Sequence, residues 1–211
     1  MSGDFDAAAL GAVVAVVDDD PSVRSALDNL ISSVGLTPCI FASAGEFMKW
    51  DVPDAPLCLV LDVRMPGRNG LDVHEELAKT RGDIPVIFIT AHGDIPMSVR
   101  AMKAGAIEFL TKPFREQDLL DAIYHGLALS HKRRDQKKTE QKLHAAYGSL
   151  SPREREVMEM VVKGKLTKQI AAQLGLSDIT VKVCRAQMMK KMEASSLADL
   201  VRMVERLNLA Q

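Results

Sequence analysis

The chain has 211 residues, enough for two domains of ordinary size, since domains most often contain roughly 100–150 residues. Hydrophobic residues make up 47% of the sequence, charged residues make up 26% and the net charge is −1, values that exclude a disordered or collagen-like protein. No apolar run reaches the roughly 18–20 residues that span a bilayer, and the cysteines form no C-x-x-C pair, so we expect a cytoplasmic protein without disulfides or zinc.

Short apolar, β-branched runs alternate with amphipathic stretches through the first 125 residues. The runs predict five strands, at Val13–Val17, Pro38–Phe41, Leu57–Leu61, Val86–Ile89 and Glu108–Leu110. The stretches predict helices over Ser22–Val34, Ala44–Trp50, Leu71–Lys79 and Met97–Ala104, and a fifth helix from Glu116 onward. Five βα units with short connections predict an α/β fold, a doubly wound parallel sheet with helices on both faces.

Polar side chains follow four of these strands at their carboxyl ends, where ligands bind in such sheets. Asp18 and Asp19 follow the first strand, Asp62 the third, Thr90 the fourth and Lys112 the fifth. Three carboxylates at one edge repel one another, and a hard cation such as Mg²⁺ relieves the repulsion. An aspartate beside a metal ion and a lysine can accept a phosphoryl group, and a nearby threonine hydroxyl can donate to it. The sequence therefore predicts Asp62 as a phosphoacceptor.

Each of these residues has a simpler interpretation when it is taken alone. Asp20 precedes Pro21 and a helical stretch, so we expect it to be a helix N-cap rather than a metal ligand. Asp62 or Thr90 alone would fit a turn or a cap equally well. The four strand ends together favour the phosphorylation site.

The composition changes at Gly126. Residues 126–148 are basic and poor in apolar residues, which predicts a linker, and the helix from Glu116 is expected to continue into it because no residue stops it. Residues 1–125 hold 10 Lys and Arg against 19 Asp and Glu, while residues 149–211 hold 11 against 7. An acidic front and a basic rear are typical of a cation-using regulatory domain joined to a nucleic-acid-binding domain, although unequal surface charge alone would give the same totals.

Residues 149–211 predict a second, all-α domain. Ser151, Pro152 and Glu154 have the order of an N-cap, a first helical position and a capping-box glutamate. Four helices are expected, at Pro152–Lys163, Thr167–Leu174, Asp178–Met192 and Leu197–Leu207.

Within this domain, Ala171, Gly175 and Val181 have the spacing of a helix-turn-helix. A small alanine lets two helices approach, a glycine supports a left-handed turn, and the valine packs the second helix on the first. Ser177 is expected to cap that second helix, whose basic surface could enter a major groove and is formed by Lys182, Arg185, Lys190 and Lys191. Many helical bundles share the Ala and Gly spacing, and the basic charge together with the acidic companion domain strengthens the DNA-binding interpretation.

The first 125 residues resemble the receiver domain of response regulators. The matching stretches are Val16–Pro21, Leu61–Gly67, Ile89–Asp94, Lys103–Ala106 and Thr111–Phe114. The resemblance implies a flavodoxin-like strand order 2-1-3-4-5, a cis peptide before Pro113, phosphorylation of Asp62, and Lys112 paired with the phosphoryl group. It also implies Mg²⁺ bound by Asp19, Asp62 and the backbone carbonyl of Arg64, with Asp18 assisting.

The same resemblance implies a switch and a dimer surface. Phe109 stands where the family has an aromatic ring whose rotamer follows the threonine hydroxyl, although packing within a strand explains its position equally well. Dimerisation is expected through the fourth helix, fifth strand and fifth helix, a surface that includes Met97, Arg100, Ala101 and Glu108.

The stretch from Leu150 to Val201 resembles the LuxR-type output domain, and with the receiver it resembles the FixJ subfamily. The resemblance implies that Lys182, Val183 and Ala186 face bases or their flanking phosphates, with Arg185 on the same helix. Thr180, Lys168 and Lys190 are the implied phosphate contacts. Cys184 and Ala186 depart from the residues common in the family, so no target sequence is carried over.

The two resemblances together imply a two-component response regulator and not an enzyme. A sensor histidine kinase is expected to phosphorylate Asp62, after which a homodimer binds paired sites in double-stranded promoter DNA and, with RNA polymerase, activates transcription. One alternative is a phosphatase of the haloacid-dehalogenase type, but its nucleophile follows the first strand and Asp62 follows the third. The other is an unphosphorylated interaction module, which the complete acidic set disfavours.

Overall fold

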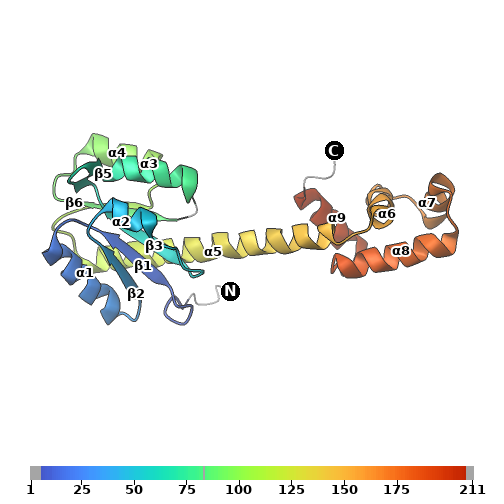
Figure 1. Ribbon diagram of the computed structural model, residues 1–211, viewed down its shortest axis with the longest axis horizontal. Coiled ribbons are helices and arrows are strands. Elements are labelled where there is room, and N and C mark those ends of the chain that lie inside the picture. The colour runs from blue at the N-terminus through green and yellow to red at the C-terminus, as the bar shows by residue number, and fades with distance from the viewer. Residues whose placement is uncertain (1–5, 83, 208–211) are drawn as a thin grey trace. The chain divides into compact units, whose positions relative to one another are not determined.

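The computed structural model describes residues 6–82 and 84–207. The chain divides into two compact units, with the boundary in the sequence between Arg134 and Asp135. Figure 1 labels most elements of both units. In the described residues, no helix is both long enough and apolar enough to cross a membrane.

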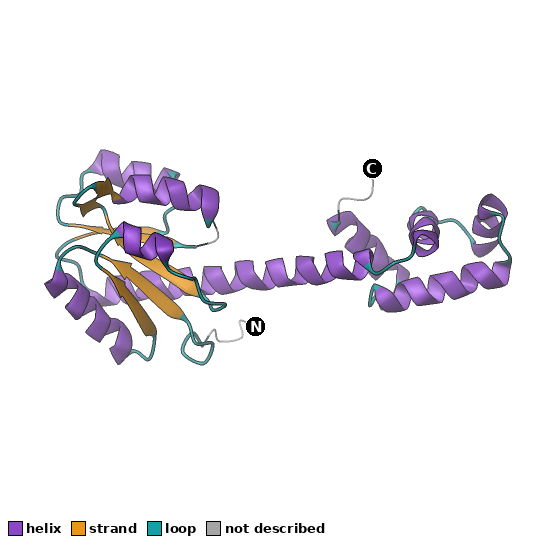
Figure 2. Cartoon of the chain, viewed as in Figure 1, coloured by secondary structure: helices purple, strands orange, loops and turns teal. Residues whose placement is uncertain are grey.

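The first unit is built on a parallel sheet of five strands (Figure 2). The strands are β1 (Val13–Val17), β2 (Thr37–Phe41), β3 (Leu57–Asp62), β6 (Val86–Thr90) and β7 (Glu108–Thr111). Their order is β2-β1-β3-β6-β7, which is the predicted order 2-1-3-4-5. Every residue of β1, β3 and β6 is buried, as expected for central strands with both faces covered. The predicted fold class is therefore confirmed.

Helices cover both faces of this sheet, and each face has its own apolar core. One face packs against α2 (Ala44–Lys49), α3 (Gly70–Thr80) and α4 (Ile95–Lys103), the other against α1 (Pro21–Ser33) and the first part of α5 (Glu116–Gly148). Alternate residues of β1 point to opposite cores, Ala15 toward α2–α4 and Val16 toward α1 and α5. Figure 1 shows the helices on the two faces of the sheet.

Side-chain caps set where these helices begin. The Asp20 carboxylate accepts a hydrogen bond from the Ser22 amide at 2.8 Å, so its predicted N-cap role is confirmed. Asp94 caps α4 in the same way from the Met97 amide, at 2.7 Å, with Pro96 in the first turn. That cap starts α4 at Ile95, two residues before the predicted start.

Helix α5 runs without interruption through the predicted linker, as expected. Its packing on the sheet continues beyond residue 125, because Leu127 is fully buried and the Ser130 hydroxyl accepts the amide hydrogen of Leu57 at 3.0 Å. A Cβ at Gly126 would lie 2.7 Å from the Cys58 sulfur, so only glycine lets the helix come this close. Residues 135–142 are all exposed. The boundaries at residues 125 and 149 stay a prediction.

The second unit contains the end of α5 followed by α6 (Pro152–Val162), α7 (Thr167–Leu174), α8 (Asp178–Lys191) and α9 (Leu197–Arg206). These are the four predicted helices. Their core is apolar and includes Leu143, Val157, Ile170, Val181, Met188 and Leu200. The predicted capping box is present, with the Ser151 amide donating to Glu154 at 2.7 Å and the Glu154 amide donating to the Ser151 hydroxyl at 3.3 Å.

Candidate functional site

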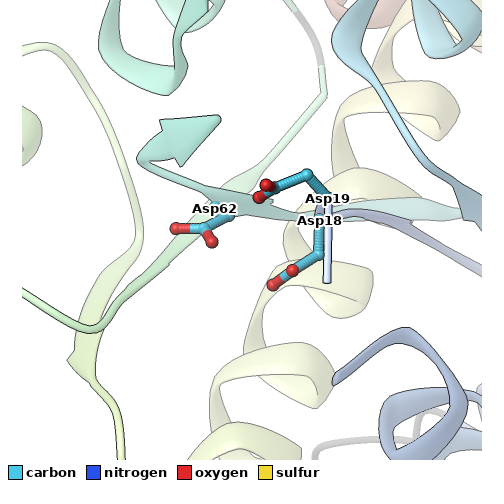
Figure 3. Close-up of side chains that lie close together, drawn as sticks. All are labelled: Asp18, Asp19 and Asp62. Atoms are coloured by element: carbon cyan, nitrogen blue, oxygen red, sulfur yellow. The ribbon is translucent and has the colours of Figure 1, made fainter. Parts of the chain in front are cut away.

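Three carboxylates meet at the carboxyl edge of the sheet. Strands β1 and β3 are neighbours in parallel register, so Asp18 and Asp19 at the end of β1 come beside Asp62 at the end of β3. One oxygen from each lies within 4.8 Å of the others (Figure 3). Asp18 and Asp62 are buried and Asp19 is exposed, so the cluster is open to solvent on one side. An all-oxygen donor set of this kind suits a hard divalent cation.

Lys112 brings the positive charge from the end of β7. Its Nζ donates to Asp18 at 2.7 Å and to Asp62 at 3.1 Å. The cis peptide between Lys112 and Pro113 is present, as the resemblance implied. Burial acts to lower the pKa of Lys112, but the hydrogen bond and charge of Asp18, with the charge of Asp62, hold that pKa above its ordinary value. Lys112 is therefore a cation at any physiological pH.

The ion pair with Lys112 does not fully offset the cost of burying the Asp18 carboxylate. Burial raises the pKa of Asp18, and although the hydrogen bond from Lys112 opposes that change, the net pKa remains above its ordinary value. The charge of the neighbouring Asp62 adds to the increase. Additional positive charge at the cluster would therefore be favourable.

A small hairpin that the sequence did not predict follows Asp62. Strands β4 (Arg64–Met65) and β5 (Arg68–Asn69) pair through a turn at Gly67, where φ is +82°. The Arg64 amide donates to the Asp62 carboxylate at 3.2 Å, and the Gly70 amide donates to the Val63 carbonyl at 2.8 Å. The Pro66-Gly67 pair was the available signal for this turn.

Gly70 closes the loop against the backbone of Asp62. A Cβ at this position would lie 2.4 Å from the Asp62 carbonyl oxygen and 3.0 Å from the Val63 Cα. Both are backbone atoms of the strand end, so they cannot move aside as a flexible side chain would. Gly70 is thus a requirement of the site that sequence periodicity could not reveal.

Thr90 and Phe109 lie on neighbouring strands beside this cluster. Thr90 is fully buried and its hydroxyl accepts the amide hydrogen of His92 at 3.3 Å. Phe109 is half-buried, with its ring centroid 6.4 Å from that of Phe88. Both contact the loop after β6, because a Cβ at Gly93 would lie 2.9 Å from the Phe109 ring and 3.3 Å from the Thr90 methyl. The sequence analysis did not identify Gly93.

The expected dimer surface on α4 needs one correction. Ala101 is fully buried and packs in the core, so the prediction that it belongs to an exposed surface is wrong. It lies one turn after the half-buried Met97, on the side of the helix that faces the sheet. The exposed apolar side chains of α4 are instead Ile95, Val99 and Met102. Arg100 pairs with Glu75 of α3 at 2.8 Å, and Glu108 is exposed.

The helix-turn-helix is formed by α7 and α8. Gly175 ends α7 in the left-handed conformation, with φ +64°, while Ala171 and Val181 are buried between the helices. The Ser177 hydroxyl accepts the Thr180 amide hydrogen at 3.1 Å and caps α8. The predicted left-handed turn at Gly175 and the predicted cap by Ser177 are confirmed. Most of the predicted DNA-contacting residues are exposed, and only Arg185 is half-buried; the exposed ones are Lys168, Thr180, Lys182, Val183, Ala186 and Lys190.

Lys191 differs from the other lysines of that basic surface in its contacts. Its Nζ donates to the buried Glu154 carboxylate at 2.7 Å and to the Ser149 carbonyl at 3.2 Å. Its side chain is 39% exposed, so its place in the predicted DNA-binding surface stays a prediction.

Comparisons with known proteins agree with both halves of the chain. The family model of the response regulator receiver domain matches residues 14–124, and that of the luxR family of bacterial regulatory proteins matches residues 148–204. The chain is a response regulator of the FixJ subfamily. This regulator is 51% identical to Nodulation protein W of Bradyrhizobium diazoefficiens, over all of this chain and 96% of that protein.

Other relatives of the response regulator have the same two-domain length. It is 50% identical to the response regulator protein TmoT of Ectopseudomonas mendocina, over 92% of this chain and 89% of that one. The solved structure of the response regulator StyR matches with a TM-score of 0.86 and 49% identity, covering 93% of this chain and 99% of that chain. Full-length FixJ from B. japonicum matches with a TM-score of 0.54 and 35% identity, covering 94% and 98%. The protein is thus a two-component transcriptional regulator.

Proposed function

We propose that a sensor histidine kinase phosphorylates Asp62, and that phosphorylation switches the regulator to a DNA-binding dimer. The observation that carries the proposal is the Asp62 carboxylate, which lies beside Asp18 and Asp19 and 3.1 Å from the Lys112 ammonium group. An Asp62 carboxylate oxygen attacks the phosphorus of a phosphohistidine, the P–N bond breaks, and the ring nitrogen leaves with the bonding electrons and takes up a proton. The regulator consumes one phosphoryl group per event and is not an enzyme in its own right.

The acidic residues would hold a magnesium ion at this site. Asp19, Asp62 and the Arg64 carbonyl would be the ligands, with Asp18 assisting, and the raised pKa of Asp18 fits a group whose charge needs a further cation. Mg²⁺ would supply positive charge that offsets the charge on the phosphoryl oxygens. Lys112, already within reach of Asp62, pairs with one of these oxygens.

The switch would follow from the same geometry. Thr90 donates its hydroxyl hydrogen to a phosphoryl oxygen, and the hydroxyl group, which now accepts from the His92 amide, reorients to do so. Because the Gly93 loop contacts both Thr90 and Phe109, movement of the threonine is passed to the aromatic ring. The result is a changed surface on α4, β7 and α5, where Ile95, Val99 and Met102 provide the apolar contacts of a homodimer.

The dimer would place two copies of α8 in successive major grooves of promoter DNA. Lys182, Val183 and Ala186 face bases, with Arg185 beside them, while Lys168, Thr180 and Lys190 contact phosphates. Promoter binding in the cytoplasm then recruits RNA polymerase and activates transcription. We assign the receiver to residues 1–125, the helical linker to 126–148 and the DNA-binding domain to 149–211.

The test combines light-scattering mass with DNA binding, each measured with and without Mg²⁺ and a small phosphodonor. The DNA is a duplex selected from a random-sequence pool by the phosphodonor-treated wild-type protein. The wild type should become dimeric and bind more tightly, and Asp62→Asn should do neither. Asp51→Asn, which removes an exposed aspartate outside the cluster, is the matched control and should behave as wild type. Equal dimerisation and binding by Asp62→Asn would contradict phosphorylation control and leave the DNA-binding assignment intact.

A further inference from the structure

An ion pair with a buried carboxylate and a partly exposed lysine lies where α5, α6 and α8 meet in the second unit. The carboxylate of Glu154, in the first turn of α6, has only 4% of its side chain exposed. It accepts a hydrogen bond from the ammonium group of Lys191, the last residue of α8, at 2.7 Å. The hydrogen bond from Lys191 is the main cause that holds the pKa of Glu154 below its ordinary value. The pair is therefore ionised at neutral pH.

This ion pair also holds the chain that leaves α5. The Lys191 ammonium donates to the carbonyl of Ser149, the residue directly after α5, at 3.2 Å. The Glu154 carboxylate accepts from the Ser151 amide at 2.7 Å. Two charged side chains thus join the start of α6, the end of α8 and the residue that follows α5.

A second contact fixes the end of α5 to α6. The Arg155 guanidinium donates to the carbonyl of Gly148 at 3.2 Å and lies 4.8 Å from the centre of the Tyr147 ring. Since Arg155 follows Glu154 directly, one turn of α6 contacts both the last turn of α5 and the end of α8. A change in the direction of α5 would have to move α8 or break these contacts.

The neighbouring Lys190 provides the contrast. It is next to Lys191 in sequence, of equal charge and, like Lys191, exposed, so the two lysines differ in the contacts of their ammonium groups and not in exposure. A lysine that binds a phosphate must present its ammonium group to DNA, whereas that of Lys191 is held by a buried carboxylate and a backbone carbonyl. The two lysines therefore have different tasks.

We propose that Lys191, together with Glu154, is a positioning residue for DNA reading and does not itself contact DNA. The pair sets the angle of α8 against α6 and the end of α5, and so determines whether the bases meet the exposed side chains of α8. The inference rests on the DNA-binding face assigned to α8 above. It goes further by dividing the lysines of that helix between DNA contact and internal support.

The two tasks predict different responses to salt and sequence. Loss of a phosphate contact weakens binding to all sequences about equally and lowers the slope of log affinity against log salt by about 0.9. Loss of helix positioning weakens binding to the preferred sequence more than to an unrelated one and leaves the salt slope unchanged. The ratio of the two affinities separates these cases.

The experiment uses the full-length, phosphodonor-treated protein with the selected duplex and a scrambled duplex of equal length. Lys191→Met should lower the affinity ratio at least about fivefold, the scale of one lost base contact, with no change in salt slope. Lys190→Met should lower both affinities equally and reduce the slope. Lys191→Arg keeps the positive charge that pairs with Glu154 and should restore the wild-type ratio.

A further variant addresses folding. Glu154→Gln/Lys191→Met removes both charges, and because no carboxylate is left unpaired, its ratio should be no lower than that of Lys191→Met. Thermal unfolding of each variant fixes a temperature at which all are folded. A reduced salt slope with an unchanged ratio for Lys191→Met would show that Lys191 binds phosphate, and wild-type values for both would show that the pair positions nothing. If Lys190→Met has no effect but Lys191→Met behaves as expected, only the contact assigned to Lys190 is wrong. If the wild type selects no duplex, the proposed DNA binding itself fails.

Discussion

Gly70→Ala tests how tightly the loop after β3 fixes Asp62, the proposed phosphoacceptor. The added Cβ would lie 2.4 Å from the Asp62 carbonyl oxygen, and real contacts of this kind are essentially never shorter than 3.0 Å, so one of the two backbones must shift by at least 0.6 Å. The backbone at the end of β3 resists this shift, because the Val63 amide donates a hydrogen bond to the Ile89 carbonyl at 3.0 Å. The substitution therefore strains the strand end that carries Asp62.

Two opposing effects set the size of the change. Overpacking of this kind costs about 1–3 kcal/mol, and the gain in helix propensity from glycine to alanine returns at most ~1 kcal/mol at the start of α3. We expect a net loss of roughly 1–2 kcal/mol in the free energy of unfolding. Since a misplacement of about 1 Å can cost 100-fold in rate, phosphate uptake at Asp62 should slow by about tenfold or more.

Urea unfolding of the receiver can be followed by the fluorescence of Trp50, which is the single tryptophan of the sequence. Phosphate uptake from a small phosphodonor can be followed by intact-protein mass. Gly45→Ala is the matched control, because its Cβ would meet only the Ser43 hydroxyl at 3.9 Å. It should be as stable as wild type or more so and take up phosphate normally. A Gly70→Ala protein with wild-type stability and uptake would refute the reasoning.

Three further predictions follow from other contacts. The Nδ1 of buried His74 has no hydrogen-bond partner among the described residues, and burial lowers the pKa of this histidine. The wild-type protein should therefore lose stability as pH falls below about 6.5. In urea unfolding, His74→Leu should lose less stability over this pH range and be roughly 1 kcal/mol more stable than wild type at pH 7. Val99→Asp should keep the phosphodonor-treated protein monomeric in light scattering. The control Val52→Asp, at an exposed valine away from α4, should dimerise. A dimer of Val99→Asp would exclude α4 as the dimer surface. Because the pKa of Glu154 is lowered in the folded protein, its ion pair with Lys191 contributes stability above about pH 4.5, and this contribution is lost as pH falls further. Lys191→Met should raise the pKa of Glu154 in an NMR titration of its carboxyl group. An unchanged titration would contradict the pairing.

Much of the fold could be predicted because local patterns determine it. The strands β1, β3 and β6 are continuous buried apolar runs, which is how central parallel strands appear in a sequence. The caps at Asp20, Ser151 and Ser177 use side chains within three residues of the amides they bind. The acidic site followed from topology, since parallel strands bring their carboxyl ends to one edge.

The features that were missed depend on contacts between distant residues. The spacing of Met97, Arg100 and Ala101 placed them near one another on α4 but did not say that Ala101 faces the core. Gly70 and Gly93 are needed because of what lies opposite them, and no pattern within α3 or the β6–α4 loop records it. Lys191 is 37 residues from its partner Glu154, and a lysine on a predicted recognition helix suggests DNA equally well.

The two lysine–carboxylate pairs of this regulator have similar geometry but opposite effects on the pKa of the carboxyl group. Lys112 with Asp18 and Lys191 with Glu154 have the same 2.7 Å distance, and in each the carboxylate is buried. Yet the pKa of Asp18 is raised, chiefly by burial with Asp62 adding to it, while the pKa of Glu154 is lowered by Lys191 and the Ser151 amide. Glu154 has enough partners to stay ionised within the domain, so its pair needs nothing from outside. Asp18 shares its lysine with a second carboxylate, Asp62, so a bound cation would offset negative charge that Lys112 alone does not balance. One lysine–carboxylate pair is therefore balanced within its own domain, whereas the other belongs to the cluster that we propose binds a cation.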